Sequence, residues 1–320
     1  MAPAATARRL IRPWGALALT GALAACVSPQ APVLSPNAPM RPTPAIVRTA
    51  PPTEASEAAR VYFARVQADL LATGLLRTDG GGRDTPFTER MLAENFIQIA
   101  LFDEYTRGPA GPVQRQSSSA LRRWEDPVRV SLRFGPSVSA NSRATDTARI
   151  GSYLARLSRL TGHPIGLSDS SPNFFIHIVS EDERRALGPA LNAALPGLSA
   201  SEVAGVTQMP LSTYCLVYAL SDGASGRYTR AFAVIRAEHP DLLRLSCFHE
   251  EIAQGLGLAN DTPRARPSIF NDDEEFALLT TQDELMLRIL YNPALRPGMS
   301  EAEARPIIQS IASALVGGGS

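Results

Sequence analysis

Residues 247 to 261 read CFHEEIAQGLGLAND, and this stretch guides the interpretation of the whole chain. Apolar residues recur on both sides of the paired acidic residues, which predicts a helix with one buried face. A glycine, Gly257, ends the pattern as helix-terminating glycines do. Glu250 and Gln254 are four residues apart, so they share a helix face, and Glu251 lies next to that face.

The segments that precede this helix show strand and amphipathic-helix patterns in turn. Residues 128–134 alternate apolar and polar side chains, as a half-buried strand does, and residues 145–162 place apolar side chains on one stripe of a helix. Further strand patterns occupy residues 173–180, 212–220 and 228–237. This order predicts an α+β fold in which helices pack against a small mixed sheet.

The order of elements and the quoted stretch together resemble the metzincin peptidases, a group of zincins. Their domain ends in the motif H-E-x-x-H-x-x-G-x-x-H, in which the three histidines bind zinc and the glutamate is the general base. In the corresponding frame of this chain, Glu251 stands at the general-base position and Gly257 at the turn. Glu250, Gln254 and Asn260 stand where the three metal ligands would be.

The resemblance continues downstream. Residues 268–270, Ser-Ile-Phe, match the metzincin Met-turn with Phe270 in place of methionine, and residues 280–291 match the closing helix. The resemblance implies a zincin-like cleft with Phe270 as its floor. His249 and Asp261 are expected to surround and support the group of polar side chains.

The chemistry of the three substituted positions differs from that of a zinc peptidase. Zinc favours nitrogen and sulfur donors, whereas one carboxylate and two amide oxygens suit a harder cation such as calcium or manganese. Without a strongly bound cation, Glu251 would have little to activate. We therefore expect no cofactor, while a divalent metal at Glu250, Gln254 and Asn260 stays open.

A second resemblance rests on a longer pattern. The stretches CFHEEIAQGLGLAND, RPSIFNDDEEFALLT and DELMLRILYNPALRPGM are similar to an uncharacterised family of bacterial lipoproteins, domain of unknown function 2927. This similarity covers roughly the last two-thirds of the chain, and it implies no established activity.

The first residues have the features of a bacterial lipoprotein signal. Three arginines precede a short apolar stretch, which ends in Leu-Ala-Ala-Cys at Cys26. We expect residues 1–25 to be removed and the Cys26 thiol to carry a diacylglycerol, so that fatty acyl chains such as palmitate anchor the protein in a membrane. The alternative is an ordinary secretory peptide that happens to contain a cysteine.

The rest of the chain divides into three predicted segments. Residues 26–55 are rich in proline and form a tether after the lipidated cysteine. Residues 56–125 form a helical extension, with helices at 56–76 and 89–105 and a loop at 107–119. Residues 126–318 form the zincin-like domain.

Charge and cysteine content limit the class of protein. Removal of the first 25 residues, which hold three arginines and no acidic residue, leaves 28 basic against 31 acidic side chains. A chain with this charge balance lacks the excess of basic residues that nucleic-acid-binding proteins use, so we expect no nucleic-acid partner.

Once Cys26 is lipidated, Cys215 and Cys247 remain as a pair. Outside the cytoplasm such a pair predicts a disulfide, with two buried thiols as the alternative.

Two functional classes remain open from the sequence. The first is a membrane-anchored envelope protein, facing the periplasm, whose zincin-like domain binds a peptide, a glycan or an envelope protein without catalysis. The second is a hydrolase or peptidase that uses an atypical metal or none. A polar pocket closed by its own hydrogen bonds would favour the first class.

Overall fold

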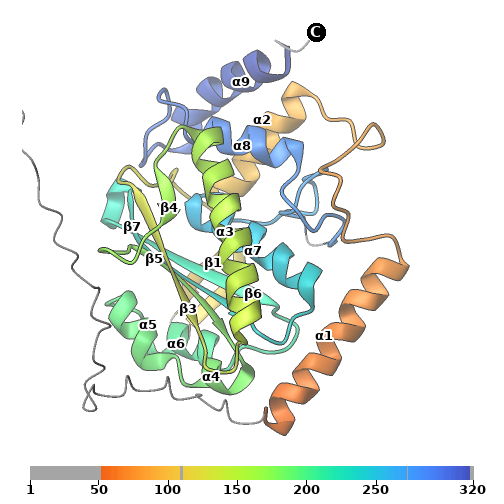
Figure 1. Cartoon of the computed structure of the whole chain (residues 1–320). Helices are drawn as coiled ribbons and strands as arrows, with labels where there is room; N and C mark the ends of the chain where they lie inside the picture. The colour runs from red at the N-terminus through yellow and green to blue at the C-terminus, as the bar shows by residue number, and fades with distance from the viewer. Residues whose placement is uncertain (1–51, 109–110, 272, 318–320) are drawn as a thin grey trace, which may run out of the picture. The chain divides into compact units, whose positions relative to one another are not determined.

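The computed structural model describes residues 52–108, 111–271 and 273–317 (Figure 1). The predicted signal peptide, the predicted lipidation site Cys26 and nearly all of the predicted tether lie outside these residues. Among the described residues, every helix is too short or too polar to cross a membrane.

A five-stranded sheet forms the centre of the fold, with the strand order β4-β3-β5-β7-β6. Strands β3, β4, β5 and β7 are parallel to one another, and β6 is an antiparallel strand beside β7 at the edge. The strands are β3 (Val128–Phe134), β4 (Ile165–Leu167), β5 (Phe174–Val179), β6 (Cys215–Ser221) and β7 (Tyr228–Arg236). The predicted α+β class with a small mixed sheet is confirmed.

One face of the sheet carries the main hydrophobic core. Helices α3 (Ala140–Thr161) and α7 (Asp241–Leu256) lie on this side (Figure 1). The apolar stripe predicted for this helix faces the core in α3, because Ile150 and Leu154 are buried there. The same core continues into the helices α2 (Glu89–Ala100), α8 (Thr281–Leu290) and α9 (Glu301–Gly317).

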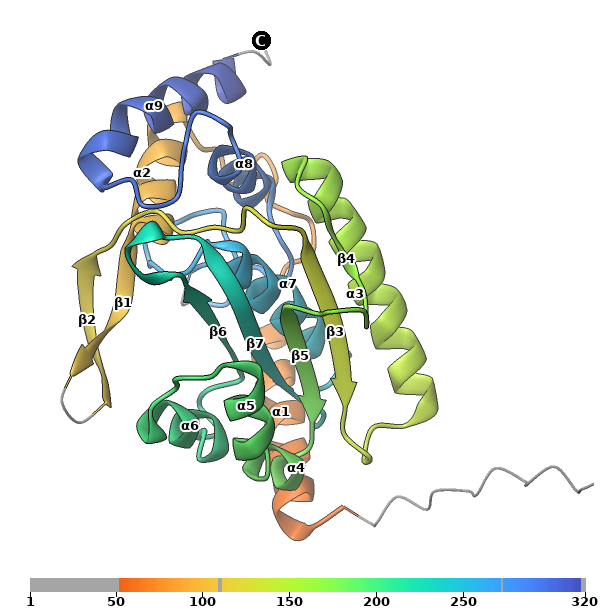
Figure 2. The ribbon, with the colours of Figure 1, turned by 90° about the vertical axis from the view of Figure 1, so that its left-hand side faces the viewer.

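The other face of the sheet is only partly covered by helices. The chain between β5 and β6 forms α4 (Glu181–Arg185), α5 (Gly188–Ala194) and α6 (Ala200–Thr207). Leu191 and Val206 from these helices pack with Phe232 and Val234 of β7 in a second, smaller core. In Figure 2, α5 and α6 lie over the lower part of the sheet, and no labelled helix lies in front of the upper, amino-terminal ends of β3, β5 and β7.

His177 of β5 belongs to this second face, and it makes the stability of the protein depend on pH. Its ring stacks on Phe232 with centroids 4.4 Å apart. Burial, and then the positive charge of Arg133, lower the pKa of His177 from 6.5 to about 4. As the pH falls below 6.5, the unfolded chain takes up the proton first, so the folded state loses stability until its own pKa is reached.

We expect this one histidine to reduce the free energy of unfolding by at most about 3 kcal/mol between pH 6.5 and 4. His177→Phe keeps a ring on Phe232 and removes the ionisable group, so its unfolding should depend less on pH in that window. Urea unfolding of both proteins at several pH values measures the difference. Parallel pH profiles would contradict the prediction.

An amino-terminal helix, α1 (Glu54–Ala72), begins two residues before the predicted helix and is part of the fold. Phe63 is fully buried, with its ring 4.4 Å from His239 and 5.8 Å from Tyr214. The Ser56 hydroxyl donates a hydrogen bond of 2.6 Å to Glu238. The predicted helical extension therefore starts with a helix that packs against Tyr214 and against the segment between β7 and α7.

A hairpin replaces part of this predicted extension. Strands β1 (Phe102–Gly108) and β2 (Gly111–Ser118) pair antiparallel, with Phe102 opposite Ser118. The prediction of a helix to residue 105 was wrong, since α2 ends at Ala100, and so was the prediction of a loop at residues 107–119. Pairing between the two strands outweighs the local helix preference of residues 102–105.

Candidate functional site

Helix α7 provides the frame of the candidate site and ends where the sequence predicts. Pro240 precedes its first residue, and Gly257 ends it with φ 129°, a region that favours glycine. A Cβ atom at Gly257 would lie 2.4 Å from the carbonyl oxygen of Arg122. Glycine is therefore required here, both for the turn and for the close approach of the neighbouring chain.

After this turn the chain folds back to α7 through Asp261. The Gln254 amide donates to both carboxylate oxygens of Asp261, at 3.1 and 3.2 Å. The side chain of Asn260 instead donates to the carbonyl oxygen of Gln98 at 2.8 Å, and its backbone N–H donates to Ile99 at the end of α2. The structure thus brings Gln254 and Asp261 together and directs the Asn260 amide group to α2.

The two glutamates of the motif lie beside the disulfide. One oxygen of Glu250, one of Glu251 and the sulfur of Cys215 lie within 4.8 Å of one another. Glu251 is 3% exposed, and one of its oxygens is buried without a hydrogen-bond partner. Burial, and then the negative charge of Asp261, raise the pKa of Glu251 well above 4.5.

This donor set does not fit zinc. The sulfur of Cys215 is bonded to Cys247, so it cannot act as a thiolate ligand. The Gln254 amide nitrogen faces Asp261, and the Asn260 amide nitrogen faces Gln98. The oxygens that remain come from carboxylates and amides, which are poor partners for zinc compared with histidine and thiolate.

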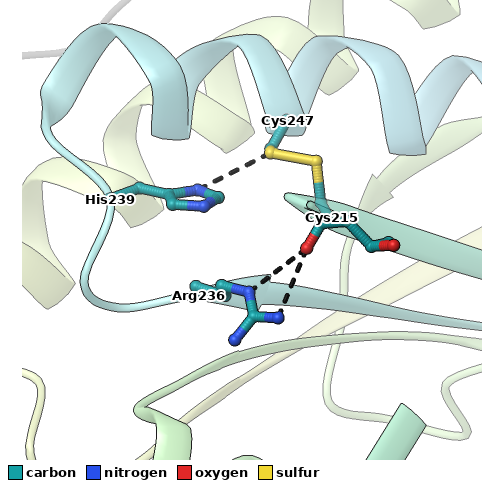
Figure 3. The surroundings of a disulfide bond; sticks show 5 residues. Cys215, Arg236, His239 and Cys247 are labelled. Atoms are coloured by element: carbon teal, nitrogen blue, oxygen red, sulfur yellow. Dashed lines mark hydrogen bonds between the residues drawn. A yellow bond between two sulfur atoms is a disulfide. The ribbon is translucent and has the colours of Figure 1, made fainter. Parts of the chain in front are cut away.

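The predicted disulfide is confirmed. Cys215, the first residue of β6, is bonded to Cys247 of α7, with 5.9 Å between the Cα atoms (Figure 3). The ring of His239 lies beside this bond, with Nδ1 3.7 Å from the Cys247 sulfur. The bridge fixes the edge strand of the sheet to the helix that carries the two glutamates.

Hydrogen bonds and packing against neighbouring side chains fix the positions of His249 and Phe270. The Nδ1 atom of His249 accepts a hydrogen bond from the Leu279 N–H at 3.1 Å, and its ring stacks on Tyr153 at 4.0 Å. Burial, and then the charge of Arg156, lower the pKa of His249 to about 3, so the ring is neutral.

Phe270 is fully buried, and its carbonyl oxygen accepts a hydrogen bond of 2.9 Å from the Thr262 N–H. The segment that contains Phe270 therefore lies against the chain just beyond Asn260 and Asp261. Phe270 belongs to the main hydrophobic core.

A further buried carboxyl group, which the sequence interpretation missed, organises this segment. Asp283 accepts hydrogen bonds from the Ser268 hydroxyl at 2.5 Å, from the Ile269 N–H at 3.1 Å and from Thr280. Burial raises the pKa of Asp283 to about 6 against the opposing effect of these hydrogen bonds. The sequence signal was the capping box formed by Thr280 and Asp283 at the start of α8.

Comparison with known proteins gives one result. The family model described as a protein of unknown function, DUF2927, matches residues 89–310 of the chain. No curated protein and no solved structure matches it. The matched region contains the whole sheet, α7 and the polar group around Glu251. Because it spans more than half of the chain, the protein belongs to the DUF2927 family of unknown function.

Proposed function

We propose that this protein is a lipid-anchored protein of the bacterial envelope whose zincin-like domain binds a partner without cleaving it. The partner would be a peptide, a glycan or another envelope protein. The zincin-like assignment is supported by the order of elements, in which β3, α3, β5, β6 and β7 lead to a helix that ends at a glycine turn.

The observation that carries the proposal is that the amide groups of Gln254 and Asn260, two of the three residues at the ligand positions, already donate hydrogen bonds within the protein. Both oxygens of Asp261 accept from Gln254, and the Asn260 amide is bound to the end of α2. A metal or a scissile bond at Gln254 or Asn260 would have to displace these hydrogen bonds. Internal hydrogen bonds of this kind are typical of polar groups that stabilise a fold.

The anchor and the envelope location rest on the lipobox at Cys26 and on cysteine chemistry. Disulfides form and persist in oxidising compartments such as the bacterial periplasm, and they are rare in the cytosol. The bond between Cys215 and Cys247 supports export of the domain.

Cys26→Ala tests the anchor directly. The variant lacks the only thiol that the lipobox offers for acylation, so labelled fatty acid should not be incorporated and the protein should be soluble or unprocessed. Cell fractionation and fatty-acid labelling measure both effects, with the unmodified chain alongside. Equal membrane retention and labelling of the variant would refute the lipid anchor.

Zinc binding tests the non-catalytic proposal. The purified protein should lack stoichiometric zinc, and it should not cleave a mixed peptide library. The double variant Glu250→His, Gln254→His places two imidazoles one turn apart on α7, near the carboxylate of Asp261. It should gain zinc affinity, measured by mass spectrometry and by competition with a coloured chelator.

The matched control for this variant is Glu250→His with Gln254→Ala, which has the first imidazole and lacks the second. It should bind zinc much more weakly than the double-histidine variant. Adding Asp261→Ala to the double variant should also weaken binding if Asp261 is the third ligand. Stoichiometric zinc in the unmodified protein would overturn the proposal.

A hydrolase is the second candidate, favoured by the carboxyl groups of Glu250, Glu251 and Asp261. Carboxyl groups in close proximity can divide the roles of acid and base between them. A hydrolase of this kind would cleave peptides from the same library, and Glu251→Gln would abolish the activity. Absence of cleavage across acid and neutral pH would exclude this candidate for peptide substrates.

A further inference from the structure

The sheet carries a pocket away from the motif, at the amino-terminal ends of its parallel strands. Its volume is about 610 Å³, within the range of about 300–1,000 Å³ usual for small-molecule sites. The lining residues include Arg129 of β3, Asn173 just before β5, Phe175 of β5 and Arg230 of β7. This is the part of the second face in front of which Figure 2 shows no labelled helix.

The sheet register places two arginines on either side of Asn173. Val130 pairs with Phe174, and Phe174 pairs with Ala231, so one residue earlier Arg129, Asn173 and Arg230 form a row across the three strands. Adjacent strands lie about 4.8 Å apart, so the backbones of the two arginines are about 10 Å apart. Residues in one row of a parallel sheet point to the same face.

Within the described residues, no ion pair joins a carboxylate to either guanidinium group. Arg129 donates to the backbone oxygens of Ser171, at 2.7 Å, and of Pro127, at 3.4 Å. Arg230 is exposed, and its side chain makes no hydrogen bond or ion pair in the part of the chain that the structure describes. Asp126 is the one carboxylate among the lining residues, so the lining has a net positive charge.

The floor and walls of the pocket are built before any ligand arrives. The Asn173 side chain accepts from the Arg129 N–H at 2.7 Å and donates to Pro127 at 2.9 Å. Trp124, a further lining residue, donates to the Gly255 oxygen at 2.8 Å and packs edge-on against Tyr228. Preformed aromatic and aliphatic surface between fixed polar groups reduces the ordering cost of binding.

We propose that this pocket binds an organic anion, in which a carboxylate or phosphate lies between Arg129 and Arg230 and an attached ring packs on Phe175. Guanidinium groups are the preferred protein partners of both oxyanions, and the aromatic floor suits a flat, apolar portion of the ligand. The inference goes beyond the proposed function because it names a ligand class at a different place, so its failure would leave the zincin-like proposal standing.

Calorimetric titration of the full chain with three probes tests the proposal. The first, 1-naphthyl phosphate, carries both the anion and the ring; inorganic phosphate lacks the ring and 1-naphthol lacks the charge. Binding should be tightest for 1-naphthyl phosphate or for its carboxylate counterpart, 1-naphthoate. Whichever of these two binds better identifies the preferred oxyanion, and binding of either supports the site.

Arg230→Gln should weaken this binding by roughly tenfold, because one charge-assisted contact is lost, while Arg230 makes no hydrogen bond or ion pair with the described residues. Arg129→Gln should have a similar effect, with thermal unfolding as a check on the loop that Arg129 holds. The matched control is Arg133→Gln, an exposed arginine on the same face of β3 outside the pocket lining.

Four results would overturn the site: equal affinity for 1-naphthol, no binding of either naphthyl anion, full affinity in Arg230→Gln, or equal weakening by Arg133→Gln. The last would mean that general charge attraction to the face explains the binding. Equal affinity for 1-naphthol would remove the role of the arginines.

Discussion

Glu181→Gln is expected to lower the free energy of unfolding by about 3–5 kcal/mol, the usual cost of breaking a buried ion pair. The carboxylate of Glu181 lies 2.5 Å from Arg236 and 2.6 Å from Arg184, and both arginines are almost fully buried. Burial opposes ionisation of Glu181, but the nearby arginines outweigh it and lower its pKa. The variant leaves two buried cations without this partner.

Urea unfolding followed by circular dichroism measures the effect. The matched control is Glu301→Gln, which removes the carboxylate of a more exposed ion pair with Arg305 on α9. Such pairs contribute less than about 1 kcal/mol, so the control should unfold almost like the unmodified protein. Similar losses in the two variants would show that Glu181 has no special structural role.

Removing the disulfide is expected to cost about 4 kcal/mol. Cys215 and Cys247 close a loop with a sequence separation of 32 residues, and the loss of chain entropy in the unfolded state grows with the size of that loop. The double variant Cys215→Ser, Cys247→Ser should therefore unfold at a lower urea concentration. Its stability should not change on addition of dithiothreitol, whereas that of the unmodified protein should fall toward the same value.

The single variants Cys215→Ser and Cys247→Ser provide the control for this experiment. Each leaves one unpaired thiol and the same open loop as the double variant. All three variants should have similar stability. A double variant as stable as the oxidised protein would mean that the loop is already ordered in the unfolded state, and that the bond contributes little.

The sequence predicted α7 and four of the five strands of the sheet, all but the three-residue β4, because their signals are local. The alternation in residues 128–134 and the glycine at position 257 express the buried face and the turn directly. The region between β5 and β6 was left unassigned, although Ser180 with Glu183 and Ser199 with Glu202 form capping boxes that mark the starts of α4 and α6. These helices are short, so their periodic patterns are weak.

The candidate site was harder to predict because its contacts are not local. The motif frame indicates Asn260 as the residue that returns to the helix, but the side chain that contacts Gln254 is that of Asp261. A shift of one residue after a glycine turn depends on how the chain packs on α2, which the motif does not contain. The pocket beside Arg129 depends on the register of three strands, and sequence alone does not give this register.

The packing of the amino-terminal segment has a consequence for where the folding unit begins. The family match starts at residue 89, yet Phe63 fills a buried position and the backbone of Leu76 and Arg77 is hydrogen-bonded to Glu274 and Glu275. A protein trimmed to the family match would expose the apolar surface around His239 and leave those backbone groups to water. Expression of the isolated domain should therefore start ahead of α1, or the product will tend to aggregate.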